Sequence, residues 1–400
     1  MGERLQVDLS AENYADKLTF QHKRSLKMIR KTMIQFAGAM LISSILLSGC
    51  GGSAAAAAGT WSTAGSSEEQ AVQSTQTAGS SESAENAETA IAAENAEAAG
   101  TSEQREESDM TGAEIYEHLY GDLTDLYAME TYDEVPEYLS EWHDDVDYGT
   151  IEADVEYYST TAGDYKYCNV LLPAGYDESQ EYPVLYMLHG FGGRYDSHVH
   201  DHSILQTLYG NMLSEGLAVP MIIVGVDMYT DILAEKDGKS DAEMRPCYDK
   251  CVEDIEQDLM PFIESRYRVK TGRMNTAVTG VSQGATTALA IAYRWQSQIA
   301  YVGSFAPCSG VIPTPFAKGT FWNTPILEDF TIESPETMPR YIYLTVGTED
   351  PWCIDSTRYY GEVMDEKGIP NQNDLVEGYD HGNDLWELGH YNFLLKVFRD

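Results

Sequence analysis

Short apolar runs alternate with segments of helical periodicity along most of the second half of the chain. The apolar runs are ADVEYYST (153–160), KYCNVLLP (166–173), PVLYMLHG (183–190), MIIVGVD (221–227), NTAVTG (275–280), YVGSFAP (301–307) and YIYLTVG (341–347). Continuous apolar strands that alternate with helices are typical of a parallel sheet covered on both faces. We therefore expect an α/β fold with a mostly parallel central sheet. In such sheets, ligands bind at the carboxyl ends of the strands.

The expected helices lie between these strands. We expect a helical opening over residues 111–129, and helical periodicity returns at 251–267, 282–295 and 355–368. In the segment 251–267 the apolar residues Val252, Ile255, Leu259 and Ile263 fall on one face, which is the pattern of a helix packed on a sheet.

The composition changes sharply near residue 110, and the segment before it divides in two. Residues 1–49 contain a cationic stretch and then the apolar run Met33–Leu47, which is too short to span a bilayer as a helix. This is the pattern of a signal peptide, for which Met28 is a more ordinary start than Met1. The run closes with LSGC, which resembles the lipobox of bacterial lipoproteins, so we expect lipid on Cys50. The alternative is a short membrane anchor followed by an unrelated cysteine.

Residues 50–110 consist mainly of Ala, Ser, Thr, Glu and Gly. Such a segment cannot bury enough apolar surface to offset its chain entropy, so we expect a disordered tether. The domain that follows, 111–400, carries 50 acidic and 17 basic residues, a net charge of −33. This charge disfavours nucleic acid and anionic membranes as partners. Contact with the membrane is therefore expected only through lipid at Cys50, on the outer face of the bacterial cell membrane.

Five cysteines remain besides Cys50: Cys168, Cys247, Cys251, Cys308 and Cys353. An odd number leaves at least one free thiol unless two chains pair. Export permits disulfides, but the spacing does not define which cysteines pair. Cys247 and Cys251 lack the second pair of ligands that a structural zinc site needs.

The stretch TAVTGVSQGATTALA, 276–290, places Ser282 between Gly280 and Gly284. A strand, then Gly-x-Ser-x-Gly, then a helix of small residues is the arrangement of a nucleophile elbow. The turn is so sharp that side chains at the glycine positions would collide with neighbouring backbone. The backbone N–H of Gln283, at the positive end of the helix, is then placed to stabilise an oxyanion.

A serine nucleophile needs a base, and the base needs an acid to orient it. In α/β hydrolases the order along the chain is serine, acid, histidine. Asp350 stands at the end of a predicted strand, with Glu349 and Asp355 as alternatives. Two histidines follow: His381 lies in a glycine-containing loop and His390 in a predicted helix. We favour His381, because loops carry catalytic groups more often than helix interiors.

The region from about Val155 to Phe398 resembles the family-one carbohydrate esterases, the esterase D-like group that includes feruloyl esterases and acetyl xylan esterases. The resemblance rests on the segments YPVLYMLHGFGG, DLMPFIESRYRV, GVSQGA, AYVGSFAP, VGTEDP and GYDHGNDLWELGHYNFL, besides VEYYSTTAGDYKYCNVLLPAGYD. It implies an α/β-hydrolase fold and the triad Ser282, Asp350 and His381. It also implies an oxyanion hole made by the backbone N–H groups of Phe191 and Gln283, with no cofactor and no metal.

We further expect four residues around these strand ends to contact the substrate: His189, His202, Trp352 and Trp386. The SQGA sequence departs from the family's frequent SMGG, which retains the backbone donor but changes the pocket wall. The segment SHVHDHS offers His198, His200 and His202 with Asp201, a spacing from which a zinc site could also be built. The alternative is a loop that lines the substrate cleft. Trp322 is a further candidate for an aromatic platform.

The function that the resemblance implies is hydrolysis of feruloyl or acetyl esters of plant cell-wall polysaccharides such as xylan, or of their fragments, through an acyl-enzyme. Two alternatives stay open. Related mycolyltransferases use the same triad to pass the acyl group to a sugar. A pseudo-hydrolase would bind carbohydrate without catalysis.

Overall fold

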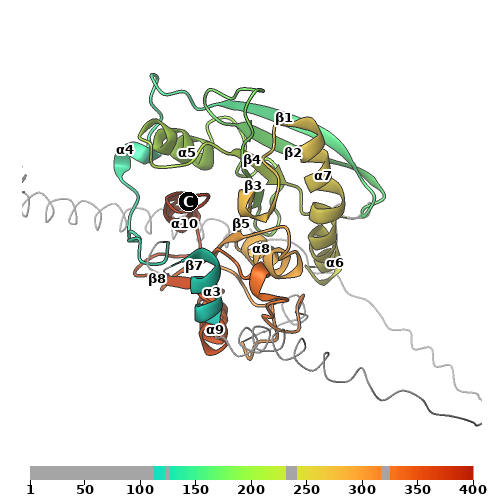
Figure 1. The fold of residues 1–400 in the computed structure, drawn as a ribbon, viewed down its shortest axis with the longest axis vertical. Coiled ribbons are helices and arrows are strands. Elements are labelled where there is room, and N and C mark those ends of the chain that lie inside the picture. Colours follow the sequence, from blue (N-terminus) through green and yellow to red (C-terminus); the bar gives the residue numbers. More distant parts are fainter. Residues whose placement is uncertain (1–111, 122–125, 231–240, 317–324, 400) are drawn as a thin grey trace, which may run out of the picture. The chain divides into compact units, whose positions relative to one another are not determined.

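The computed structural model describes residues 112–121, 126–230, 241–316 and 325–399. The predicted signal peptide, Cys50, all of the predicted tether and Trp322 lie outside these residues. An eight-stranded sheet forms the centre, in the order β1-β2-β4-β3-β5-β6-β7-β8 (Figure 1). Its strands are β1 Thr150–Ser159, β2 Asp164–Leu172, β3 Val184–Leu188, β4 Ile222–Val226, β5 Thr276–Val281, β6 Tyr301–Phe305, β7 Tyr341–Gly347 and β8 Gln372–Val376.

The six strands from β3 to β8 are parallel, and β1 and β2 form an antiparallel hairpin at one edge. Cys168 of β2 lies opposite Val226, the last residue of β4. Because β2 runs against β4, the residues of β2 before Cys168 extend past the carboxyl ends of the parallel strands. The predicted α/β-hydrolase fold with a mostly parallel sheet is therefore confirmed.

Helices cover both faces of the sheet (Figure 1). The helices are α3 Gly112–Tyr120, α4 Glu137–Ser140, α5 Ile204–Ser214, α6 Asp241–Asp254, α7 Met260–Arg266, α8 Gln283–Arg294, α9 Ile354–Glu366 and α10 Asn383–Leu394. One apolar core lies between the sheet and helices α3, α6, α7, α8 and α9. A second lies between the opposite face and helices α4, α5 and α10. The central strands β3 to β7 are buried along their whole length, which explains why their sequences are continuous apolar runs.

The helix expected at 251–267 is not a single regular α-helix. It begins earlier, as α6, and passes through a π-helical turn, η1 Ile255–Leu259, before continuing as α7. At this turn the N–H of Met260 donates to the carbonyl of Ile255, five residues back. Three of these helices and strands were not predicted, α4, α5 and β8. The sequence of β8 is QNDLV, which is polar and only partly buried, so it lacks the apolar run by which the other strands were recognised.

Within the described ranges, no helix is long and apolar enough to cross a membrane.

Candidate active site

Ser282 lies between β5 and α8, with backbone angles of φ 55° and ψ −120°. A Cβ atom on Gly280 would lie 2.4 Å from the backbone of Gly284, and one on Gly284 would lie 2.4 Å from the carbonyl oxygen of Leu188. Both glycines are thus needed for close backbone approach, as predicted for a nucleophile elbow. A non-glycine residue at such a positive φ costs about 1–3 kcal/mol. Hydrogen bonds on both sides of Ser282 hold it there, from its N–H to Phe305 and from the N–H of Thr286 to its carbonyl.

His381 lies between β8 and α10, where its ring bridges the other two triad residues. Its Nε2 is 2.9 Å from Ser282 Oγ, and its Nδ1 is 2.6 Å from Asp350 Oδ2. A carboxylate only accepts hydrogen bonds, so Nδ1 carries the proton and Nε2 presents its lone pair to the serine hydroxyl. His390, the alternative base, is buried and its Nδ1 is hydrogen-bonded to the carbonyl of Trp386.

Asp350 follows β7 and is 1% exposed. Its second oxygen, Oδ1, accepts hydrogen bonds of 2.9 Å from the backbone N–H groups of Trp352 and Cys353. Burial alone would raise the pKa of this carboxyl group, but the hydrogen bond and charge of His381 and the two N–H donors lower it below its usual value. The alternatives Glu349 and Asp355 are exposed to solvent and make no hydrogen bond to His381.

A disulfide bond joins Cys353, three residues after the catalytic acid, to Cys308, three residues after β6. The bond links the ends of two neighbouring strands next to the triad. The other described cysteines, Cys168, Cys247 and Cys251, are buried thiols. In the described part of the chain one cluster has the residue types of a metal site, Asp350, Cys353 and His381. Its sulfur is engaged in the disulfide, and its other two residues are engaged with each other.

The turn after β3 carries the second predicted oxyanion donor, Phe191. A Cβ on Gly190 would lie 3.5 Å from Cβ of Ser282, so this turn is in contact with the nucleophile. The carbonyl of Gly190 accepts hydrogen bonds from the N–H of Gly193 and from Nδ1 of His189. Since the peptide unit is planar, these bonds also fix the opposite direction of the Phe191 N–H. The other donor, Gln283, is the first residue of α8, whose leading N–H groups have no acceptor within the helix.

The expectation that His189 contacts the substrate is wrong, because this side chain is 1% exposed. Its Nε2 accepts a hydrogen bond from the N–H of Met228, which leaves Nδ1 as the donor to Gly190. Burial lowers the pKa of His189 to about 4, so the ring stays neutral near pH 7. His189 therefore holds the oxyanion turn in place through the hydrogen bond from its Nδ1 to the carbonyl of Gly190.

Two of the predicted substrate residues flank the catalytic base. The rings of Trp352 and Trp386 lie edge-to-face against His381, with centroids at 5.2 and 5.8 Å. Trp352 is 70% exposed and available to a ligand. His202 instead packs against Trp142, in the segment before β1, and has no ring contact with the triad. Substrate contact by these three side chains stays a prediction.

The histidines of SHVHDHS do not converge on one point. His198 lies against Trp386 and His390, and His200 is hydrogen-bonded to the carbonyl of Asp196. With His202 on Trp142, the three rings have three separate surroundings. This arrangement does not provide the shared coordination point that the zinc alternative requires.

One residue that shapes the site, Tyr248, was not singled out from the sequence. Tyr248 of α6 accepts a hydrogen bond of 3.0 Å from the N–H of Gly192 in the oxyanion turn. Its ring also contacts Phe191 and Tyr229, with centroids 5.7 and 5.3 Å away. A tyrosine in a helix of mixed composition carries no local signal for such a role, because the contact depends on the packing of α6 against the turn that follows β3.

Comparison with known proteins agrees with this geometry. The esterase family model, described as "Putative esterase", matches residues 159–388. The structure of a CE1 ferulic acid esterase from the anaerobic fungus Anaeromyces mucronatus is 32% identical, with a TM-score of 0.60, covering 67% of this chain and 98% of that one. The same enzyme in complex with ferulic acid gives a TM-score of 0.62, covering 68% and 98%.

Two curated relatives are larger proteins. An endo-1,4-beta-xylanase/feruloyl esterase of Xylanibacter ruminicola is 29% identical over 166 residues, which are 40% of this chain and 22% of that protein. Endo-1,4-beta-xylanase Y of Acetivibrio thermocellus is 26% identical over 156 residues, 36% of this chain and 13% of that protein. The match thus spans about a fifth or less of the length of these relatives. From the family match and the assembled triad, the chain belongs to the esterase family, as a family-one carbohydrate esterase and serine carboxylic ester hydrolase.

Proposed function

We propose that this protein hydrolyses feruloyl esters of xylan or of xylan fragments. The observation that carries the proposal is the assembled triad of Ser282, His381 and Asp350 on a nucleophile elbow. The chain is also 32% identical to an esterase whose structure holds ferulic acid. The exposed ring of Trp352 beside His381 suits an aromatic acyl group or a sugar ring, because both offer a flat apolar face.

The reaction follows from the positions of the hydrogen-bonding groups. His381 Nε2 takes the proton of Ser282 while Oγ attacks the ester carbonyl. The N–H groups of Phe191 and Gln283 stabilise the oxyanion that forms. The imidazolium is stabilised by Asp350, and it then protonates the sugar oxygen as the bond from that oxygen to the acyl carbon breaks. Water repeats the attack on the acyl-enzyme, with His381 again as the base.

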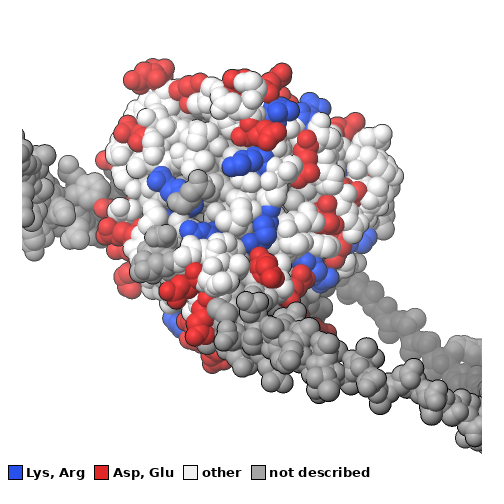
Figure 2. Space-filling model, viewed as in Figure 1, with Lys and Arg blue, Asp and Glu red and all other residues white. Residues whose placement is uncertain are grey.

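The remaining parts of the proposal concern location and partner. We propose that Cys50 carries lipid and that residues 50–110 tether the esterase to the outer face of the cell membrane. The domain from residue 111 has a net charge of −33, and on the face drawn in Figure 2 acidic side chains are spread over the periphery. This charge favours a neutral polysaccharide over a polyanion as the substrate carrier. Mass spectrometry of the membrane fraction, before and after Cys50→Ser, tests the anchor: loss of the lipid-modified peptide supports it, and its absence from the unchanged protein refutes it.

The test of the reaction uses methyl ferulate and acetylated xylo-oligosaccharide as paired substrates. We expect ferulate release that is lost in Ser282→Ala and retained in Ser297→Ala, which changes an exposed serine in the turn after α8, outside the site. Release of acetate alone would change the acyl group assigned. Release of neither, by a folded protein, would refute hydrolysis of both esters.

A further inference from the structure

The hairpin of β1 and β2 has one exposed face that is rich in tyrosine. Tyr158 is 53% exposed, Tyr165 58% and Tyr167 37%. Exposed and buried residues alternate along both strands in this part of the hairpin, so the three tyrosines belong to one face. We call Tyr158, Tyr165 and Tyr167 the tyrosine face.

The register of the hairpin brings these side chains together. Tyr158 lies directly opposite Tyr165, with ring centroids 5.3 Å apart. Tyr167 lies opposite Glu156, and its hydroxyl donates a hydrogen bond of 2.9 Å to that carboxylate. The face thus offers adjacent aromatic rings with a carboxylate at their side. Rings give apolar contact, and the hydroxyl and carboxylate oxygens accept hydrogen bonds from sugar hydroxyls.

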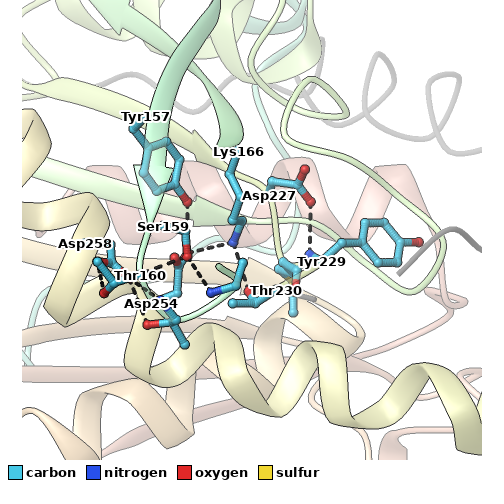
Figure 3. A network of polar contacts seen from close by, with 12 residues as sticks. Tyr157, Ser159, Thr160, Lys166, Asp227, Tyr229, Thr230, Asp254 and Asp258 are labelled. Carbon is cyan, nitrogen blue, oxygen red and sulfur yellow. Dashed lines mark hydrogen bonds and ion pairs between the residues drawn. The ribbon is translucent and has the colours of Figure 1, made fainter. Parts of the chain in front are cut away.

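The opposite, buried face of the hairpin is fixed by a polar network (Figure 3). Lys166 Nζ is 2.6 Å from Asp254 Oδ2, and both side chains are almost fully buried. The hydroxyl of Tyr157 donates to the same carboxylate oxygen at 2.8 Å. Lys166 also donates to Thr230, in the loop after β4. A buried ion pair with several hydrogen-bonding partners strongly restricts where its two backbones can lie.

The turn of the hairpin is held in the same way. Asp258 of η1 accepts hydrogen bonds from the hydroxyl groups of Thr160 and Thr161 and from the N–H of Thr161, at 2.6 to 3.0 Å (Figure 3). Burial would raise the pKa of Asp258, but these donors lower it below its usual value. These contacts fix the position of the tyrosine face, so less conformational entropy is lost when a ligand binds it.

The tyrosine face and the active site both lie at the carboxyl ends of the parallel strands. The segment of β2 before Cys168 extends beyond the carboxyl end of β4, toward the side where Ser282 follows β5. Tyr195, in the loop that begins with the oxyanion turn, connects the two regions. Its hydroxyl donates to Asp154 at 2.6 Å, at the bulge of β1, and its ring centroid is 6.2 Å from that of Tyr167.

We propose that the tyrosine face binds the neutral polysaccharide backbone of the substrate while its ester group occupies the active site. This inference rests on the proposed function. The sheet order puts β2 three strands from β5, a lateral distance of about 14 Å at 4.7–4.9 Å per strand. A backbone several sugars long spans that distance, whereas a small ester does not. The carboxylate of Glu156 beside the rings and the net negative charge of the domain favour a neutral glycan over an anionic one.

Calorimetric titration with unesterified xylohexaose and xylobiose tests the proposal without any turnover. We expect xylohexaose to bind the unchanged protein more tightly than xylobiose. The double variant Tyr158→Ser/Tyr165→Ser should bind xylohexaose about tenfold more weakly, which corresponds to about 1.4 kcal/mol. The variant Tyr158→Phe/Tyr165→Phe keeps the ring faces and should retain most of the affinity. Tyr138→Ser removes a similarly exposed tyrosine (48%) outside the tyrosine face and serves as the matched control.

The kinetic form of the test compares kcat/KM on feruloylated arabinoxylan with kcat/KM on methyl ferulate. We expect this ratio to fall about tenfold in the double serine variant and to be unchanged in Tyr138→Ser. Equal xylohexaose affinity for the double variant and the unchanged protein would overturn the proposal. A dimer in solution that dissociates on the double substitution would overturn it too, because the tyrosine face would then be an interface between copies. Failure of the proposed function appears separately, as absence of turnover of methyl ferulate by the unchanged protein.

Discussion

Removal of the disulfide beside the catalytic acid should cost both stability and turnover. The bond closes a loop with a sequence separation of 45 residues. In the chain-entropy model, a crosslink over a loop of that length stabilises the folded state by about 4 kcal/mol at room temperature. We therefore expect the free energy of unfolding of Cys308→Ala/Cys353→Ala to fall by about that amount. Urea unfolding followed by circular dichroism measures it.

The free thiol of Cys168 provides the control, because it is fully buried and forms no crosslink. Cys168→Ala removes the same atoms from the core, so twice its effect estimates the packing loss in the double variant. A loss in the double variant no larger than twice the loss in the control would refute the crosslink argument.

Turnover is the second readout of the same variant. The N–H of Cys353 donates to Asp350 Oδ1, so release of Cys353 loosens one of the groups that orient the acid. Because a misplacement of about 1 Å in an active site can cost about a hundredfold in rate, we expect kcat to fall well below that of Cys168→Ala while KM changes less. Equal kcat values for the two variants, each measured below its melting transition, would mean that the disulfide does not position the acid.

Three further predictions test the site. Gly284→Ala places a Cβ 2.4 Å from the carbonyl of Leu188, so turnover should drop by about a hundredfold or more; Gly175→Ala, whose Cβ meets no atom within 4 Å, should lower thermal stability and leave kcat intact. Asp350→Asn removes the acceptor that holds the tautomer of His381, and kcat should fall by about 10⁴ with little change in KM, as steady-state kinetics will report. Burial lowers the pKa of His390 to about 4, below its unfolded value, so the native state binds fewer protons. The free energy of unfolding should therefore decline as the pH falls from about 6.5 to about 4. Because asparagine does not titrate, this decline, measured by urea unfolding, should be smaller in His390→Asn.

The fold and the triad were predictable because their signals are local. Seven strands were recognised from apolar runs, and Ser282 was marked by two glycines whose positions tolerate no side chain. Asp350 and His381 followed from the order of triad residues along the chain. The strand β8 was missed because an edge strand buries little and its polar sequence resembles a loop.

The failures concern contacts that only tertiary packing defines. His189 has the sequence context of a cleft residue, immediately before the oxyanion turn, yet its ring turns inward to Met228. The partners of the disulfide lie 45 residues apart, and their proximity depends on β6 and β7 being neighbours. The pairing of Lys166 with Asp254 likewise required knowledge of which helix covers the hairpin.

The order in which the triad is distributed along the chain has a consequence for synthesis. His381 follows β8, which is the last strand of the sheet in sequence as well as its outer member. A nascent chain therefore has its nucleophile and its acid before it has its base. Translation that stops before residue 381 yields a polypeptide with most of the sheet and no means of activating Ser282. Esterase activity in a cell thus reports only molecules whose translation has passed residue 381, whereas an antibody against the elbow region also detects interrupted products.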